Sequence, residues 1–171
     1  MVGEVDPSRR IIRPAAPGDV DSLARIYNFF VRETIVTFEE EPVSSAEMSR
    51  RVAEVNDASL PWLVAEQDGE VAGYAYATKW KARHGYRFST EVTVYVREAG
   101  AGRGTGSALY GQLLPALQAR GIHAVIGGIA LPNPASVALH EKFGFEKVAH
   151  FKETGFKLGR WIDVGYWEKL L

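Results

Sequence analysis

The sequence predicts a single domain of mixed α and β structure, in which a mixed sheet of six or seven strands is covered by helices on both faces. A length of 171 residues suits one domain with its own hydrophobic core. Segments with the two-residue alternation of strands are separated by segments whose apolar residues recur at helical spacing. We place the domain at residues 9–171 and expect residues 1–8 to be a flexible tail.

In the N-terminal part, residues 11–15 predict a short strand, and a helix follows for which Asp19 is the expected N-cap. The apolar positions of that helix recur at i, i+3, i+4 and i+7, namely Leu23, Ile26, Tyr27 and Phe30. Ser44 and Glu47 have the spacing of a capping box, which predicts a second helix that ends near Asn56.

The central part predicts three strands. Residues 62–67 and 70–78 are β-rich and are separated by Asp68 and Gly69, a pair typical of a tight hairpin. Residues 88–96 alternate between two faces, with Val92, Val94 and Val96 on one and Glu91, Thr93 and Tyr95 on the other.

The C-terminal part begins with a glycine-rich turn and a helix that should stop at Gly121. A strand over residues 123–130 follows, and then a short helix bracketed by Pro134 and Gly144. Two closing strands surround a turn at Gly159. The order strand, glycine turn, helix places the turn at a helix N-terminus.

Composition excludes several classes of function. Twenty basic against 21 acidic residues create no general field for a nucleic acid, so we expect no nucleic-acid partner. The absence of cysteine removes thiolate nucleophiles and sulfur-ligated metals, and the four histidines lack metal-ligand spacing, so no metal site is predicted. No apolar run approaches the ~20 residues that span a bilayer. The charged N-terminal residues do not resemble a signal peptide, and we expect a cytoplasmic location.

The glycine turn is the strongest local motif. Backbone N–H groups at such a helix start suit a phosphate or pyrophosphate, although a tight strand-to-helix connection would also tolerate glycine. The spacing fits neither a P-loop, since no lysine follows, nor the dinucleotide fingerprint, since Ser107 stands where a glycine is needed. The candidate anion-binding residues are Gly102, Arg103, Gly104, Thr105, Gly106 and Ser107.

The sequence A-G-R-G-T-G at 101–106 resembles the coenzyme A loop of the GCN5-related N-acetyltransferases (GNAT), written R/Q-x-x-G-x-G/A. Residues 131–145 are similar to the next segment of that superfamily. Ala101 departs from the pattern, so binding of the pyrophosphate would depend more on backbone amides and Arg103. Four separated blocks resemble the phosphinothricin and methionine sulfoximine acetyltransferase subfamily, and they lie at residues 27–42, 61–77, 80–83 and 156–167.

The resemblance implies the GNAT fold, acetyl-CoA as cosubstrate and a small amino-acid analogue as acceptor of the acetyl group. It also implies direct attack of the α-amino group on the thioester in a ternary complex. Subfamily members are typically homodimers. An interface could involve the aromatic C-terminal region, although such residues equally suit a core: Phe156, Trp161, Tyr166 and Trp167.

Glu91 is the candidate general base, because an ammonium must lose a proton before it attacks and the position resembles the glutamate assigned that role in the subfamily. A solvated strand glutamate is the simpler alternative. Since an ordinary glutamate has a pKa of only ~4.3, we expect burial to raise it or a water chain to relay the proton.

The resemblance assigns further roles near the thioester. Backbone amides of the fourth strand would bind the cofactor and the oxyanion, here those of Val94, Tyr95 and Val96. His140 stands where many members have a tyrosine acid, and it could donate a proton, order a water or serve only structure, with Tyr110 as a rival donor. Asn133 could contact coenzyme A while it also caps a helix.

The acceptor would be bound by a basic and aromatic set. Lys81 and Arg83 could pair with its carboxylate, although a solvated loop would look the same. The subfamily resemblance adds Tyr76, Ala82 and Tyr86 nearby, and an apolar wall from Phe38 and Val164. Two other functions stay open: a GNAT enzyme acting on a protein N-terminus or an aminoglycoside, and a non-catalytic acyl-CoA sensor.

Overall fold

The computed structural model describes residues 10–100 and 102–171, so the predicted tail at residues 1–8 lies outside the described part. In chain order the elements are β1 (Ile11–Pro14), α1 (Val20–Glu33), α2 (Ser45–Asp57), β2 (Trp62–Gln67), β3 (Glu70–Lys79), β4 (Ser89–Val96), α3 (Thr105–Gln118), β5 (Ala124–Leu131), α4 (Pro134–Lys142), β6 (Glu146–Lys157) and β7 (Arg160–Leu170). No helix in these ranges has the length and apolar character needed to cross a membrane.

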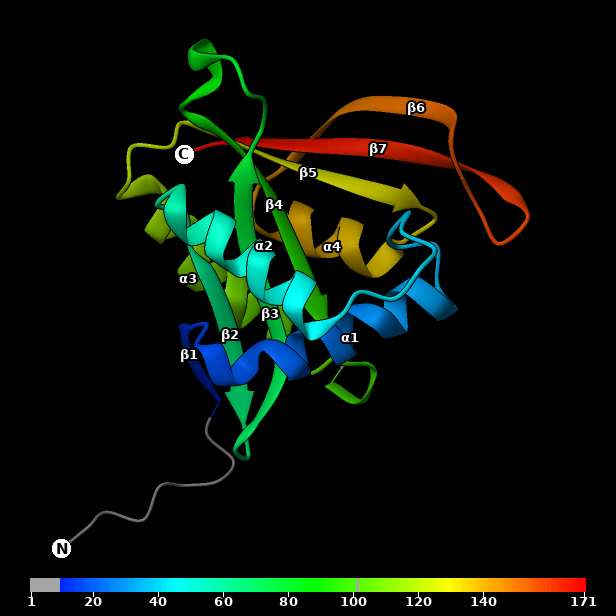
Figure 1. Cartoon of the computed structure of the whole chain (residues 1–171). Coiled ribbons are helices and arrows are strands. Elements are labelled where there is room, and N and C mark those ends of the chain that lie inside the picture. Colours follow the sequence, from blue (N-terminus) through cyan, green and yellow to red (C-terminus); the bar gives the residue numbers. More distant parts are fainter. Residues whose placement is uncertain (1–9, 101) are drawn as a thin grey trace, which may run out of the picture.

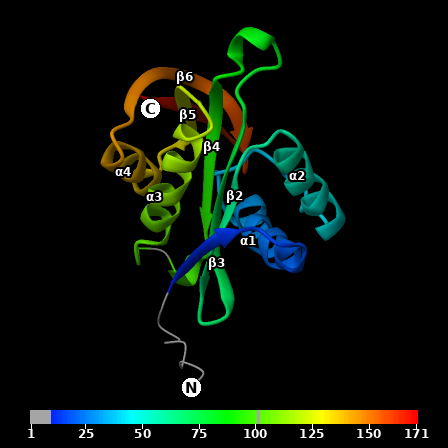
Figure 2. The same cartoon turned by 90° about the vertical axis from the view of Figure 1, so that its left-hand side faces the viewer.

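The strands form one seven-stranded sheet in the order β1-β2-β3-β4-β5-β7-β6 (Figure 1). Helices α1 and α2 lie on one face and α3 and α4 on the other, which is clearest in Figure 2. The helices pack on the two faces of the sheet through a continuous apolar core. This core includes Leu23, Met48, Val64, Leu109, Leu113 and Val125. The mixed sheet with helices on both faces confirms the fold class predicted from the sequence.

The pairing of β4 with β5 is the exception in this sheet, because it is parallel whereas every other strand pair is antiparallel. It is also short. Only Ser89 to Glu91 are in register with Ala124 to Ile126. Within the described residues, the remainder of β4 has no partner on this side, so the two strands diverge beyond Glu91. The divergence opens the middle of the sheet.

The turn and helix-cap residues predicted from the sequence can be compared with the structure. Asp68 and Gly69 form the hairpin turn between β2 and β3, with φ of 55° and 76°. Ser44 caps α2 by accepting a hydrogen bond from the Glu47 N–H at 3.1 Å. Asp19 occupies the N-cap position of α1 as predicted, but its side chain caps no amide of the helix, because it pairs with Arg13 of β1 at 2.7 Å and accepts from the Ala16 N–H.

Candidate active site

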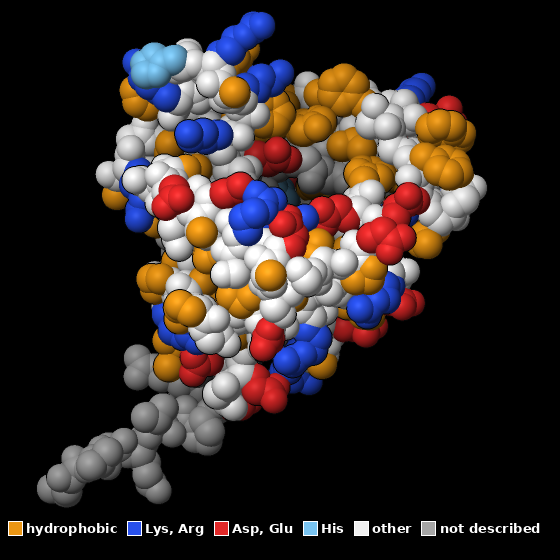
Figure 3. All heavy atoms as spheres, viewed as in Figure 1, with side chains coloured by type: hydrophobic (Ala, Val, Ile, Leu, Met, Phe, Trp, Pro, Cys, Tyr) orange, Lys and Arg blue, Asp and Glu red, His pale blue; other side chains and the backbone are white. Residues whose placement is uncertain are grey.

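The divergence of β4 and β5 leaves a cavity of about 540 Å³ on the face that carries α1 and α2. Glu91, Thr93 and Tyr95 project into it from successive outward positions of β4. The opposite wall comes from β5, β6, β7 and the loop between α1 and α2, with lining residues that include Gly128, Ala130, Gly155, Val164, Tyr166 and Phe38. Figure 3 shows the hollowed face, with hydrophobic side chains gathered over β6 and β7.

Glu91 is the acidic side chain that β4 places at this opening. Its carboxylate has no hydrogen bond or ion pair among the described residues, and burial raises its pKa above the usual glutamate value. Gly128 leaves the space beside it open, because a Cβ there would lie 3.2 Å from Glu91 Oε1 and 3.1 Å from the Tyr166 ring. An unpaired carboxylate of raised pKa is suited to accept a proton.

A second, smaller hollow adjoins the first and contains His140 and Tyr110. His140 is only 3% exposed, and its Nδ1 lies 2.8 Å from the Ser136 carbonyl oxygen. Because a carbonyl can only accept, Nδ1 carries the proton and Nε2 accepts from the Tyr110 hydroxyl at 3.0 Å. Burial lowers the pKa of His140 and raises that of Tyr110. The two side chains therefore form a neutral hydrogen-bonded pair.

Asn133 borders the same hollow from the start of α4. Its Oδ1 accepts a hydrogen bond from the Ser136 N–H at 3.1 Å, and Pro134 occupies the first helical position. The side chain thus caps α4, as the Asn-Pro pair predicts. Its amide nitrogen stays available for another contact.

The glycine turn leads directly into α3. Gly102 and Gly104 have φ of 75° and 78°, a region that residues with a side chain rarely adopt, and Gly104 precedes the first helical residue, Thr105. Gly106 serves a different purpose, since a Cβ there would lie 3.1 Å from Leu139 of α4. Ala101 lies outside the described residues.

Side chains from elsewhere reach this turn. Arg10 donates to the Arg103 carbonyl at 3.0 Å, and Lys142 of α4 donates to Ser107 Oγ at 3.0 Å. The first turn of α3 therefore presents helix N–H groups next to the cations of Arg10 and Lys142, a combination that suits an anion.

The predicted acceptor-binding residues separate into three places. Phe38 and Val164 share the cavity with Glu91. Tyr76 stacks on Trp62 with ring centroids 4.0 Å apart and lines a different hollow beside α2. The third group lies away from Glu91 within this chain, because the loop after β3 projects past the end of the sheet (Figure 1) and lines a hollow near Arg120. This group consists of Lys81, Ala82, Arg83 and Tyr86.

Tyr166, Thr93 and Gly128 line the cavity but were not among the residues singled out from the sequence for this site. Thr93 had a signal, because it lies two residues from Glu91 on the same face of the strand. Tyr166 and Gly128 had none, since their contact with Glu91 depends on how β5 and β7 pair.

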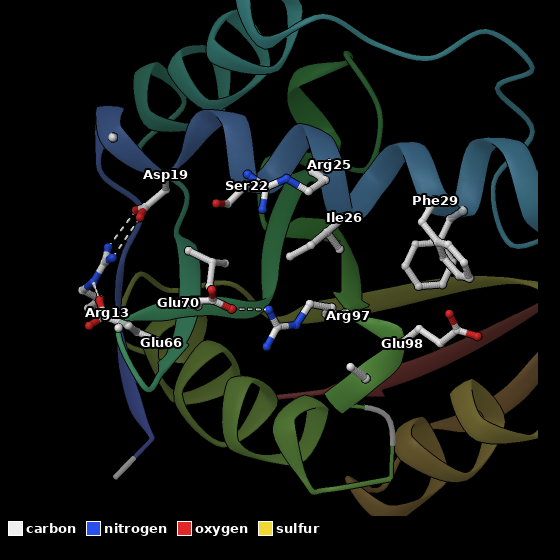
Figure 4. Close-up of a pocket in the computed structure, with 15 residues that line it drawn as sticks. Arg13, Asp19, Ser22, Arg25, Ile26, Phe29, Glu66, Glu70, Arg97 and Glu98 are labelled. Carbon is white, nitrogen blue, oxygen red and sulfur yellow. Dashed lines mark hydrogen bonds and ion pairs between the residues drawn. The ribbon is translucent and has the colours of Figure 1, made fainter. Parts of the chain in front are cut away.

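A further cavity of about 560 Å³ lies between α1 and the β2–β3 turn (Figure 4). Its charged residues are largely engaged with one another: Arg13 pairs with Asp19 and Glu66, and Arg97 pairs with Glu70 at 2.5 Å. No residue predicted for catalysis or binding lines it. Over residues 10–100 and 102–171, no group of His, Asp and Glu side chains could hold a metal ion.

Comparison with known proteins gives consistent results. Residues 12–165 match the acetyltransferase (GNAT) domain family. The sequence is 40% identical over 167 residues to the phosphinothricin N-acetyltransferase of Streptomyces viridochromogenes, covering 96% of this chain and 91% of that protein. It is 34% identical over 158 residues to the L-methionine sulfoximine/L-methionine sulfone acetyltransferase of Salmonella typhimurium, covering 91% of each.

The fold comparison agrees. A GNAT superfamily phosphinothricin acetyltransferase from Sinorhizobium meliloti, crystallised in complex with AcCoA, superposes with a TM-score of 0.92 at 37% identity, over 95% of this chain and 88% of that one.

Proposed function

Because the chain belongs to the GNAT acetyltransferase family and is an acyltransferase, we propose that it moves the acetyl group of acetyl-CoA to the α-amino group of a small amino-acid analogue. Acceptors of the phosphinothricin, methionine sulfoximine or methionine sulfone type fit the relatives' names. The observation that carries the proposal is the unpaired Glu91 carboxylate at the point where β4 and β5 diverge. Since the chain has no cysteine for an acetyl-enzyme, the amine attacks the thioester directly.

The residues present fit coenzyme A. The turn of Gly102, Gly104 and Gly106 exposes the first amides of α3 to a pyrophosphate, with Arg103, Thr105 and Ser107 around it. On the β5 side, β4 has free edge positions from Val94 to Val96, including Tyr95, which a pantetheine arm can pair with. Asn133 lines the smaller hollow that contains His140 and Tyr110, and its amide nitrogen is available for the cofactor. The cosubstrate supplies the activated thioester.

Glu91 takes the proton from the acceptor. An α-ammonium group has a pKa near ~8 and does not attack until it is deprotonated. A carboxylate whose pKa is raised by burial is a stronger base than an exposed one, which improves proton transfer at neutral pH. Thr93 and Tyr166 lie beside it in the cavity and limit the directions from which the amine can approach.

The backbone N–H groups of β4 near Val94, together with the nearby pair of Tyr110 and His140, stabilise charge on the reacting thioester. The free N–H groups of this strand stabilise the negative charge that develops on the carbonyl oxygen. The departing thiolate then meets the pair of Tyr110 and His140. We assign to the Tyr110 hydroxyl a hydrogen bond to the thiolate, in which its one hydrogen would turn from His140 Nε2 to the sulfur, because Nδ1 of His140 already donates to the Ser136 carbonyl and Nε2 carries no hydrogen.

Phe38 and Val164 form the apolar wall for the acceptor side chain. The proposed carboxylate ligands, Lys81 and Arg83, lie outside this cavity in the same chain. Their role therefore requires that this loop, with Tyr86, reaches the cavity of a second copy of the chain in a homodimer. Mixing Glu91→Gln and Arg83→Ala subunits would restore one intact site per dimer if this is so.

Exposed aromatic residues support a homodimer. Phe156 and Trp161 are 51% and 63% exposed and pack edge to face on β6 and β7, at the edge of the sheet. The other two predicted interface residues lie elsewhere: Trp167 is buried in the core, and Tyr166 lines the cavity.

A thiol-release assay with acetyl-CoA and a panel of acceptors tests the proposed function. We expect release of coenzyme A with methionine sulfone, methionine sulfoximine or phosphinothricin and none with aminoglycosides or peptide N-termini. Binding of acetyl-CoA in calorimetry without thiol release from any acceptor would indicate a sensor. Absence of binding would contradict the proposal altogether.

A further inference from the structure

Among the residues that the structure describes, Lys157 is the lysine that is buried, with an exposed fraction of 2%. It lies at the end of β6, and its Nζ reaches the main chain of α1 and of the loop between α1 and α2. There it donates to the Thr37 carbonyl at 2.7 Å and to the Phe30 carbonyl at 3.2 Å. Burying an ammonium group is costly unless it is well hydrogen-bonded. The fold therefore keeps this lysine inside for the contacts that it makes.

The Thr37 carbonyl belongs to the segment that forms the acceptor wall, and the Phe30 carbonyl lies shortly before that segment. Phe30 is in the last turn of α1, and Thr37 lies in the loop to α2, directly before Phe38. Val36, Thr37 and Phe38 all line the cavity that contains Glu91. Lys157 thus joins β6 to the main chain of the loop next to the proposed substrate contact.

Gly155 provides a second contact from the same strand. A Cβ on Gly155 would lie 2.1 Å from Cε1 of Phe38, so the ring occupies the space that the missing side chain leaves. Because residues two apart in a strand face the same side, Gly155 and Lys157 meet the loop together. Lys157 holds the main chain of the loop, and Gly155 leaves room for the ring of Phe38.

The other polar contacts of this loop reach the helices, while its Ile35 packs in a small apolar cluster with Ala130 of β5 and Ile162 of β7. The Tyr27 hydroxyl and Thr37 Oγ1 are 2.7 Å apart, and Arg51 of α2 pairs with Glu39 at 2.5 Å. These polar interactions tie the loop to α1 and α2, whereas the hydrogen bonds that tie its main chain to β6 are those of Lys157. Because Phe38 and Val164 line the same cavity, a shift of the loop relative to β6 would change the space between them.

We propose that Lys157 is a positioning residue for the acceptor: by holding the carbonyls of Phe30 and Thr37, it presses Phe38 onto Gly155 and sets the width of the acceptor site. β6 thereby determines which amino-acid side chains fit. This inference rests on the proposed function, since it concerns the acceptor of that reaction.

The test compares Lys157→Met with Lys152→Met, an exposed lysine of the same strand. We expect Lys157→Met to lower kcat/KM for the acceptor by ~10- to 100-fold, mainly through a higher KM, because a displacement of about 1 Å can cost that much. Discrimination between methionine sulfone and alanine should fall with it. The Kd for acetyl-CoA should stay within about twofold in both variants, and Lys152→Met should match the wild type.

Hydrogen exchange of residues 34–41 supplies a readout that does not need turnover. Faster exchange in Lys157→Met, with the rest of the chain unchanged, supports the inference even if no acceptor is acetylated, in which case only the proposed function fails. A folded Lys157→Met with unchanged exchange, acceptor KM and discrimination overturns the inference.

A lysine needed only for stability would lower Tm and leave the acceptor KM unchanged well below that temperature. If Lys157→Met does not fold, Gly155→Ala decides, because its Cβ displaces Phe38 from an exposed strand. A raised acceptor KM in Gly155→Ala supports the inference, and an unchanged KM overturns it.

Discussion

The backbone of Gly127 lies directly against the imidazole of His140: a Cβ on Gly127 would stand 2.4 Å from Nε2 and 2.7 Å from Cδ2. The same Nε2 accepts the hydrogen bond of Tyr110. We therefore expect Gly127→Ala to push the ring away, break this hydrogen bond and destabilise the protein by ~1–3 kcal/mol, as overpacking does. Both the melting temperature and the turnover of this variant should be lower than those of the wild type.

Gly111 is the matched control for that variant. It is exposed on α3, and a Cβ there would meet nothing within 4 Å. Gly111→Ala should stabilise the protein by ~0.5–1 kcal/mol, because glycine is unfavourable inside a helix. Equal stability of the two variants would mean that His140 does not pack on β5 as described.

Tyr110 and His140 should behave as one unit in catalysis. Tyr110→Phe removes the hydroxyl with little change in shape, and we expect turnover to fall by ~10- to 100-fold. His140→Gln should cost less, and the double variant should cost no more than Tyr110→Phe alone, because residues that act together are not additive. Steady-state kinetics of the two single variants, the double variant and the wild type make up a double-mutant cycle that measures this coupling. Additive losses of turnover would show that the two side chains contribute to catalysis independently.

Replacing Glu91 tests the general base. Glu91→Gln keeps the shape of the side chain and removes its ability to accept a proton, so turnover at neutral pH should fall at least ~10²-fold. Binding of acetyl-CoA, followed by calorimetry, should hardly change, since the proposed pyrophosphate site lies at the start of α3. Turnover equal to that of the wild type would remove Glu91 from this role.

How far the sequence predicts this molecule depends on the range of each interaction. The hairpin at Asp68 and Gly69 and the Ser44 cap follow from contacts within a few residues, and both were predicted. Asp19 was assigned a cap because the local pattern cannot show that Arg13 of the neighbouring strand competes for its carboxylate. The tertiary contact is the stronger one, because it is bidentate and charged.

The candidate site depends on longer-range geometry. The alternation around Glu91 predicts which side chains share a face of β4, but not that β4 and β5 separate beyond that residue. The proximity of Lys157 to Thr37, 120 residues earlier in the chain, is likewise invisible to periodicity. In the same way, the basic loop of Lys81 and Arg83 looks suited to a carboxylate, whereas its place relative to Glu91 is set by the whole sheet.

The pKa of Glu91 also predicts how stability depends on pH. Burial raises this pKa in the folded protein, so folded molecules keep the proton over a pH range in which unfolded molecules have lost it. Stability that Glu91 contributes at low pH is therefore lost as pH rises through its folded pKa. Glu91→Gln should be more stable than the wild type at pH 7, in contrast to its loss of activity.

Urea unfolding of both proteins across this pH range measures the effect. The gain should shrink as pH falls from the folded pKa of Glu91 toward the unfolded carboxyl pKa of ~4.3 and vanish below it, because both side chains are then neutral. Glu41→Gln, at an exposed position, serves as the control and should shift stability by less than ~0.5 kcal/mol at every pH. A gain in Glu91→Gln that does not vary with pH would contradict the linkage.

Trp161 tests the homodimer. It is 63% exposed on β7, at the aromatic edge of the sheet, and a lysine there would place a charge in an interface that should be apolar at its centre. We expect Trp161→Lys to halve the mass found by sedimentation, and to lower turnover if Arg83 acts on the partner's cavity. Ile11→Lys, at 40% exposed on the opposite edge strand, is the control and should keep the wild-type mass. Identical masses for Trp161→Lys and the wild type would exclude this edge as the contact between copies.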